Sequence, residues 1–375
     1  MAAPLKAVGG FAPRAVFEVS PSITRSYFLG HHAGALTSMR KVLSNINLIL
    51  ECRDSRVPLT STNPLLESAL AGRDRIVVYT KADLCAPASA NRWIDKQKEL
   101  LTKFHSGSPG IVAEEGGEDG YGGAEVVFTD AGSPRSIKKL IDAVKERAVA
   151  SDSLTGLRAL VVGMPNAGKS TLLNALRAEG VQLPKAARTG AQPGITRKLS
   201  TPVRVIAEDT AAGLEGGVFV VDTPGVFVPY VTDVEAMLKL SLVGCVKDGL
   251  VPAETVADYL LFRLNLRDPE MYSELSSPTN DIREFLDNIA VRTGKLLKGG
   301  VPSQEQAADW IVQQWRKGNL GRFGLDDVSE ETLASLRAKA LAGGEQHLSM
   351  NQAKKREKEA RKARNTAKRK AAEGS

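Results

Sequence analysis

The feature that most constrains this chain is a glycine-rich loop within residues 158–171, RALVVGMPNAGKST. Apolar and β-branched residues before the loop predict a buried strand, and the apolar spacing after it predicts a helix. The loop has the pattern G-x-x-x-x-G-K-S, with its fixed positions at Gly163, Gly168, Lys169 and Ser170. Backbone N–H groups and the positive end of the helix dipole would face one point, so we expect a polyphosphate to bind there.

Each part of this loop has an expected role. Lys169 would reach the β and γ phosphates of a nucleotide, and the Ser170 hydroxyl would hold Mg²⁺. The neighbouring Asn166, Ala167 and Thr171 would complete the nucleotide-binding stretch. A glycine turn before an ordinary core helix is the alternative. The loop alone does not choose the base, because an ATPase or kinase carries the same pattern.

A second motif addresses the base. Thr80-Lys81-Ala82-Asp83 follows an apolar strand pattern and resembles the guanine-reading motif N-K-x-D. The Asp83 carboxylate would accept hydrogen bonds from N1–H and the exocyclic amine of guanine, and Lys81 would cover the ring. Thr80 replaces Asn, which puts the contacts to N7 and to the phosphate loop in question. Thr129-Asp130-Ala131 weakly matches the element that meets guanine O6. A solvated turn is the alternative.

Three further positions suit a nucleotide switch. Asp222, in the motif D-T-P-G at the end of a strand pattern, would supply a second carboxylate for Mg²⁺, usually through water. Gly225 would give its N–H to the γ-phosphate and move when that phosphate leaves. Thr196, in P-G-I-T, would join Mg²⁺ only when the γ-phosphate is present. A common turn and a loop hydroxyl are the alternatives.

Strand and helix patterns alternate through the first two thirds of the chain, which predicts an α/β fold: a mostly parallel sheet with helices on both faces. We expect strands at 47–51, 75–79, 125–129 and 159–162, and an antiparallel pair near 199–206 and 217–222. We expect helices at 36–43, 64–70, 88–104, 134–148 and 169–176. Later patterns are only helical, near 233–245, 252–265, 279–293 and 303–317, and predict a separate all-α domain.

The order of the motifs is itself informative. The guanine elements precede the phosphate loop, whereas ordinary small GTPases have them after it. The chain therefore looks like a circularly permuted P-loop GTPase, with the motif order G4-G5-G1-G2-G3. Permutation leaves the sheet intact, because the chain is cut in one loop and rejoined elsewhere. It also attaches the switch region directly to the C-terminal helices.

Within the permuted GTPases, the chain resembles the bacterial YlqF/RbgA ribosome-assembly family over roughly residues 27–326. The matching stretches are GHH at 30–32, ECRDSRVPLTSTNP at 51–64, TKAD at 80–83, GMPNAGKST at 163–171, PGITR at 193–197, DTPGVFVP at 222–229, LKLSLVGCVKDGLVPAETVADYLL at 238–261 and GNLGRFGLD at 318–326. The resemblance implies a GTPase that uses GTP and Mg²⁺.

The resemblance also implies further roles. Asn166 matches an asparagine that helps related GTPases bind K⁺ beside the phosphates. Val226 follows D-T-P-G where other GTPases have a water-orienting glutamine, so intrinsic hydrolysis should be slow. His31 aligns with a family histidine proposed to complete the site. The family has W-F-P-G-H there and this chain has Y-F-L-G-H, so His32 and a structural role for His31 stay open.

The net charge of +7 belongs to the C-terminal tail. Residues 354–370 carry ten Lys or Arg and two Glu, and the rest of the chain is close to neutral. The tail has no aromatic residues, so it would bind ribosomal RNA phosphates by charge and without base specificity. A solvated helix is one alternative, and an anionic membrane surface is another.

Other sequence features concern the cellular compartment and the domain boundaries. It contains no run of 18 apolar residues, so no transmembrane segment is expected. Its three cysteines are far apart and suit a reducing compartment. We divide the chain into a presequence or disordered N-terminus at 1–27, a GTPase domain at 28–232 with a flexible insertion at 106–124, a helical domain at 233–345 and a basic tail at 346–375.

The resemblance to this family implies one expectation. The chain should be a GTP-hydrolysing assembly factor for the mitochondrial large ribosomal subunit, with hydrolysis completed on the ribosome releasing it. It should lie on the matrix side of the inner membrane, in peripheral association with that membrane. An RNA-binding scaffold that binds GTP with little turnover is the alternative from another class.

Overall fold

The computed structural model describes residues 11–19, 23, 30–86, 91–106, 125–151, 153–190, 196, 199–228, 231, 233–341, 355 and 358–359. Almost all of the expected insertion at 106–124 and of the basic tail lies outside these residues. Of the expected N-terminal segment, only residues 11–19 and 23 are described.

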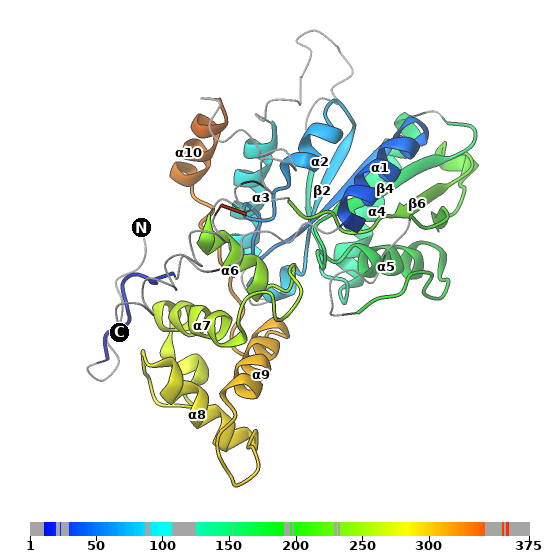
Figure 1. Ribbon diagram of the computed structural model, residues 1–375. Helices are drawn as coiled ribbons and strands as arrows, with labels where there is room; N and C mark the ends of the chain where they lie inside the picture. Colours follow the sequence, from blue (N-terminus) through cyan, green and yellow to red (C-terminus); the bar gives the residue numbers. More distant parts are fainter. Residues whose placement is uncertain are drawn as a thin grey trace.

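One six-stranded sheet forms the core, in the order β3-β2-β1-β4-β6-β5 (Figure 1). Its strands are β1 (Leu48–Asp54), β2 (Arg75–Thr80), β3 (Glu125–Phe128), β4 (Leu157–Gly163), β5 (Val203–Ile206) and β6 (Val218–Asp222). Neighbours pair in parallel except β5 with β6, which are antiparallel. The expected sheet, with its single antiparallel pair, is confirmed.

Helices cover both faces of this sheet. They are α1 (Gly30–Val42), α2 (Pro64–Ala69), α3 (Asn91–Ser106), α4 (Pro134–Ala150) and α5 (Lys169–Val181). One face packs against α4 and α5, and the other packs against α1, α2 and α3. Because parallel strands need crossover connections, the helices lie on both faces and leave the carboxyl ends of the strands along one edge.

Several elements are longer than expected, among them the first strand and the first helix. The strand predicted to end at 51 continues to Asp54, because its polar end is buried and paired. Arg53 is 1% exposed and bonds Glu51 and Glu67 at 2.7 and 2.6 Å. The first helix begins at Gly30 rather than near 36. Its Gly-His-His start lacks the usual helix-start residues, while Ala35 and Met39 are buried against the sheet.

Helices alone follow the sheet, with a core of their own. They are α6 (Val234–Leu242), α7 (Ala253–Arg267), α8 (Ile282–Thr293), α9 (Gln304–Arg316) and α10 (Glu330–Leu341), and we call them the C-terminal helices. The first four match predicted segments; α10 was not predicted, because its apolar spacing is weak. Within the described residues, no helix is both long and apolar enough to cross a membrane.

Two segments connect distant parts of the chain. Residues 11–19 lie against α7, where Phe17 meets the Tyr259 ring edge-on at 5.3 Å and Arg14 pairs with Asp258 at 2.5 Å. This part of the expected N-terminal segment therefore packs against α7. The segment after α9 returns to the sheet, where the Leu325 N–H donates to the Arg56 carbonyl at 2.7 Å.

Candidate nucleotide-binding site

The phosphate loop connects β4 to α5 at the carboxyl edge of the sheet. Gly168 has φ +84°, a conformation that favours glycine, and α5 begins at the next residue. The Lys169 ammonium donates to the Met164 carbonyl at 2.8 Å. Burial lowers the pKa of Lys169, because the charged form loses its hydration. The loop is thus folded around the Lys169 side chain.

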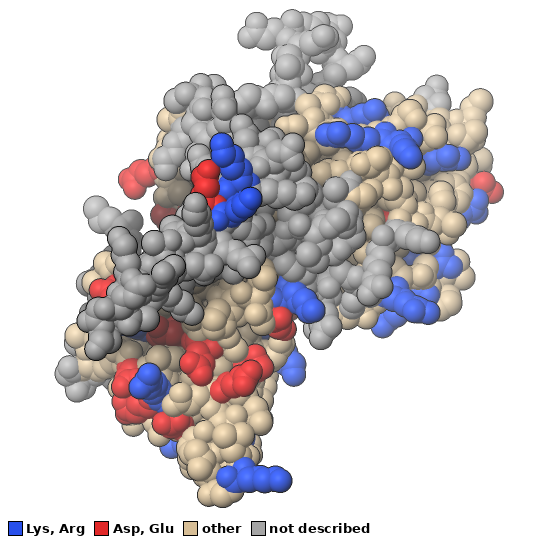
Figure 2. All heavy atoms as spheres, viewed as in Figure 1, with Lys and Arg blue, Asp and Glu red and all other residues tan. Residues whose placement is uncertain are grey.

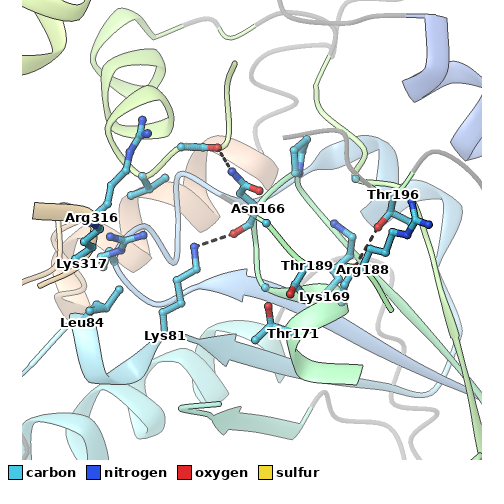
Figure 3. A pocket seen from close by; sticks show the side chains of 18 of the residues that line it. Lys81, Leu84, Asn166, Lys169, Thr171, Arg188, Thr189, Thr196, Arg316 and Lys317 are labelled. Atoms are coloured by element: carbon cyan, nitrogen blue, oxygen red, sulfur yellow. Dashed lines mark hydrogen bonds between the residues drawn. The ribbon is translucent and has the colours of Figure 1, made fainter. Parts of the chain in front are cut away.

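The guanine loop is hydrogen-bonded directly to the phosphate loop, although 85 or more residues separate them. The Thr80 hydroxyl lies 2.8 Å from the Ala167 carbonyl. The Lys81 ammonium donates to the Asn166 carbonyl at 2.8 Å (Figure 3). A Cβ on Gly168 would lie 3.2 Å from the Thr80 hydroxyl. Threonine therefore contacts the phosphate loop here, which was in question from the sequence.

A cavity of about 200 Å³ opens beside this junction. Thr80, Lys81 and Asp83 line it together with Thr129, Asp130 and Ala131, so both expected base-reading elements meet there. Partial burial raises the pKa of the Asp83 carboxyl, and the nearby Asp130 carboxylate adds to the effect. A guanine base, which offers two N–H donors, would relieve this unfavourable burial.

Three oxygens meet on the other side of the phosphate loop. The Ser170 hydroxyl donates to Asp222 Oδ2 at 2.5 Å and lies 3.1 Å from the Thr196 hydroxyl. Burial raises the pKa of the Asp222 carboxyl, against the hydrogen bond from Ser170 and the charge of Lys169. Among the described residues, Asp222 Oδ1 is buried without a hydrogen-bond partner. This set of oxygens, with one unsatisfied carboxylate atom, fits Mg²⁺.

Gly225 lies against the phosphate loop. A Cβ there would be 2.6 Å from the backbone of Pro165, so only glycine fits without a shift. The next residue, Val226, donates its N–H to the Gly163 carbonyl at 3.1 Å and accepts from the Asn63 amide at 2.8 Å. Val226 and Phe227 are both buried in apolar clusters. These buried side chains serve packing.

The two candidate histidines lie in the first turn of α1. The side chains of His31 and His32 are outside the part of the chain that the structure describes. Asn166 is described: its side-chain amide donates to the Gly244 carbonyl, beyond α6, at 2.7 Å. The loop residue expected to help bind K⁺ therefore contacts the turn that follows α6.

Sequence reasoning missed one wall of the site. A cavity of about 310 Å³ is lined by the phosphate loop, Thr196 and Gly225, and also by residues of the C-terminal helices (Figure 3). Those missed residues are Val243, Gly244, Gln313, Arg316 and Lys317. No motif marks them, because they are brought here by the packing of α6 and α9. Two of the matching stretches were the only sequence signal: 238–261 contains Val243 and Gly244, and 318–326 begins directly after Lys317.

Asp54 and Arg56 were also missed. The Arg56 guanidinium binds the Asp54 carboxylate at 2.8 Å, and Lys81 binds its same oxygen at 2.8 Å. Burial opposes the charged carboxylate, yet Arg56 and Lys81 hold the pKa of Asp54 well below its usual range. This buried pairing fixes Lys81 beside the phosphate loop.

The fold and site define a class: a P-loop protein whose guanine loop precedes its phosphate loop in the chain. Comparison with known proteins agrees. Residues 158–291 match the family model described as 50S ribosome-binding GTPase. Mitochondrial GTPase 1 of Schizosaccharomyces japonicus is 38% identical, with 82% of this chain and 91% of that protein covered.

Two more relatives extend the comparison. Mitochondrial ribosome-associated GTPase 1 of Xenopus tropicalis is 31% identical, covering 84% of this chain and 98% of that protein. Ribosome biogenesis GTPase A of Priestia megaterium is 30% identical, covering 82% and 98%. The chain therefore belongs to the RbgA-type family of circularly permuted GTPases, together with the mitochondrial GTPase 1 proteins. It is a GTP-hydrolysing enzyme.

Proposed function

We propose that this GTPase is an assembly factor for the mitochondrial large ribosomal subunit. GTP would favour an arrangement of the C-terminal helices that holds immature ribosomal RNA, and hydrolysis completed on the ribosome would release the protein. A coupling of about 1–3 kcal/mol between nucleotide and ribosome is sufficient for such a switch.

The observation that carries the proposal is the junction of three parts of the chain at one site. The guanine loop, the phosphate loop and the C-terminal helices meet through the Thr80–Ala167, Lys81–Asn166 and Asn166–Gly244 contacts. A nucleotide bound there would contact the C-terminal helices, which we propose hold the immature ribosomal RNA. Guanine is favoured over adenine, because the matching family is one of GTPases and Asp83 lines the base cavity.

Different residues would bind different parts of the nucleotide. Asp83 would accept from guanine, while Lys169 would hold the β and γ phosphates. The backbone of residues 166–171 would surround the phosphates, and Thr80 and Lys81 would support it. Gly225 would donate its N–H to the γ-phosphate, and its position next to Pro165 would change when that phosphate leaves.

Two cations are part of the proposal. Ser170, Thr196 and Asp222 would hold Mg²⁺, which supplies charge for the phosphoryl transfer. Asn166 would help hold K⁺ beside the phosphates, and positive charge there would stabilise the transition state. His31 would complete the site for hydrolysis on the ribosome.

The partner and location are inferred from the relatives. The matching family model is described as ribosome-binding, and one relative is named as associated with the mitochondrial ribosome. The basic tail would add contacts with ribosomal RNA phosphates. We place the protein on the matrix side of the mitochondrial inner membrane, held peripherally by the same tail on anionic lipids.

The test is GTP hydrolysis by the full chain, with and without mitochondrial large ribosomal subunits, in KCl and in NaCl. We expect slow hydrolysis alone, faster hydrolysis with subunits, and a further increase in KCl. Lys169→Ala should abolish nucleotide binding. Hydrolysis that subunits leave unchanged would favour the scaffold alternative, in which GTP is bound with little turnover.

The base assignment has a sharper test. Asp83→Asn should weaken GTP binding and strengthen binding of xanthosine triphosphate, because the asparagine amide can donate to the xanthine C2 carbonyl. Competition binding with both nucleotides measures this exchange. If Asp83→Asn bound GTP as the unmodified chain does, Asp83 would not read the base.

A further inference from the structure

All charged side chains that line the larger cavity, among the described residues, are basic. Among the described residues, six Lys or Arg side chains line it and no Asp or Glu does. They are Arg56, Lys81, Lys169, Arg188, Arg316 and Lys317. Such a lining suits a polyanion, which fits the nucleotide phosphates of the proposed function.

Four of these six basic groups are already bonded to the protein. Lys81 and Arg56 bind Asp54, Lys169 donates to the Met164 carbonyl, and Arg316 binds Asp248 at 3.0 Å. These four therefore have part of their charge or hydrogen-bonding capacity satisfied without a ligand.

The other two, Arg188 and Lys317, are exposed, and their side chains have no hydrogen-bond or ion-pair partner among the described residues. They approach the cavity from different parts of the molecule. Arg188 precedes Thr196 on the GTPase side, whereas Lys317 directly follows α9 (Figure 3). Lys317 is thus the unpaired basic group that the C-terminal helices present to the site.

We propose that Lys317 contacts the phosphates of the bound guanine nucleotide, so that the nucleotide holds the end of α9 directly. This proposal rests on the proposed nucleotide site. It adds a contact from outside the GTPase sheet, at a residue that no motif marks.

The neighbours of Lys317 hold its backbone in place. Trp315 is buried, and the Arg56 guanidinium lies 4.8 Å from its ring. The Arg316 guanidinium donates to the Ser241 and Leu242 carbonyls at 2.7 and 2.9 Å. A lysine between such anchors loses mainly side-chain freedom on binding, so its contact with phosphate costs little ordering of the backbone.

The residue that follows Lys317 is also held in place. Gly318 has φ +82°, and a Cβ there would lie 3.0 Å from the Leu84 side chain, next to Asp83. Arg316 binds the end of α6, and the Gly244 carbonyl just beyond it accepts the Asn166 amide. The end of α9 is therefore connected to both nucleotide loops, and a phosphate contact would strengthen that connection.

The experiment measures competition of GTP, GDP and guanosine with a fluorescent GDP analogue on the full chain. We expect Lys317→Ala to weaken GTP and GDP binding by about 3- to 10-fold and to leave guanosine binding unchanged, because only the phosphates lose a charged partner. Lys317→Arg should keep affinity within about 2-fold, since it keeps the charge.

Lys298→Ala is the matched control, because Lys298 is an exposed lysine in the same helical region and does not line the cavity. It should bind all three ligands normally. Lys317→Ala with unchanged GTP and GDP binding would overturn the proposal, and so would an equal loss for guanosine. Failure of the unmodified chain to bind GTP would instead refute the nucleotide site itself.

Discussion

The Thr80 hydroxyl helps to join the two nucleotide loops. Thr80 stands where the guanine motif has asparagine, and its hydroxyl lies within hydrogen-bond distance of the Ala167 and Arg53 carbonyls at 2.8 and 3.1 Å. Thr80 is 5% exposed, so these carbonyls have little access to water there. The shorter side chain can make this contact because Gly168 has no Cβ, which lets the loops approach closely.

Thr80→Val should therefore lower the free energy of unfolding by about 1–2 kcal/mol, because it keeps the shape and leaves a buried carbonyl without its donor. Urea denaturation measures the change. Thr80→Ser is the control and should retain more stability, since it keeps the hydroxyl. Equal stability of the valine variant and the unmodified chain would show that the hydroxyl contact contributes nothing.

At the scale of elements, the segment after α9 ties the C-terminal helices to the loop after β1. Asp326 accepts from the Leu59 and Thr60 N–H groups at 2.9 and 2.8 Å and from the Thr60 hydroxyl at 2.6 Å. Lys239, on α6, lies 3.3 Å from the same carboxylate. One buried carboxylate thus connects three elements that are far apart in the chain.

Asp326→Ala should lower the free energy of unfolding by about 2–4 kcal/mol, because it removes several charge-assisted hydrogen bonds and leaves buried donors unpaired. Denaturation measures the loss, and hydrogen exchange should quicken at the Leu59 and Thr60 amides. Asp95→Ala, at an exposed position on α3, should change stability by no more than about 0.5 kcal/mol. Similar effects of the two substitutions would contradict this reading of Asp326.

At the scale of the whole molecule, charge is unevenly distributed. Figure 2 shows Lys and Arg side chains over α1 and α5, and Asp and Glu side chains gathered over α7. Arg40 and Lys41, for example, are exposed at the end of α1. The side near α1 and α5 therefore suits RNA phosphates better than the α7 side does.

Removing residues 346–375 should leave GTP hydrolysis by the protein alone unchanged and should weaken binding to large ribosomal subunits. The salt dependence of binding should also become shallower, because fewer counterions are released when the tail's basic residues are absent. Sedimentation with subunits across a salt series measures both effects. An unchanged slope would exclude the tail as a phosphate-binding arm.

Much of the sheet could be predicted, because each parallel strand is a short apolar run followed by a helix. The ends of elements were less predictable. The sequence predicts a loop at Arg53 and Asp54, since charged residues rarely lie in a buried strand. Only the ion pairs that these residues make in the folded protein explain why the strand continues through them. The motifs also predicted both nucleotide loops, and in the structure these loops are in contact through Thr80 and Lys81.

By itself, the sequence determined the motifs, their permuted order and the strand-and-helix alternation, because each depends on residues close together in the chain. Only the tertiary structure decided that α9 and the turn after α6 form a wall of the nucleotide site. Arg316 and Lys317 carry no local pattern. They reach the site through the packing of Trp315 and the hydrogen bonds of Arg316, contacts between residues more than 70 positions apart.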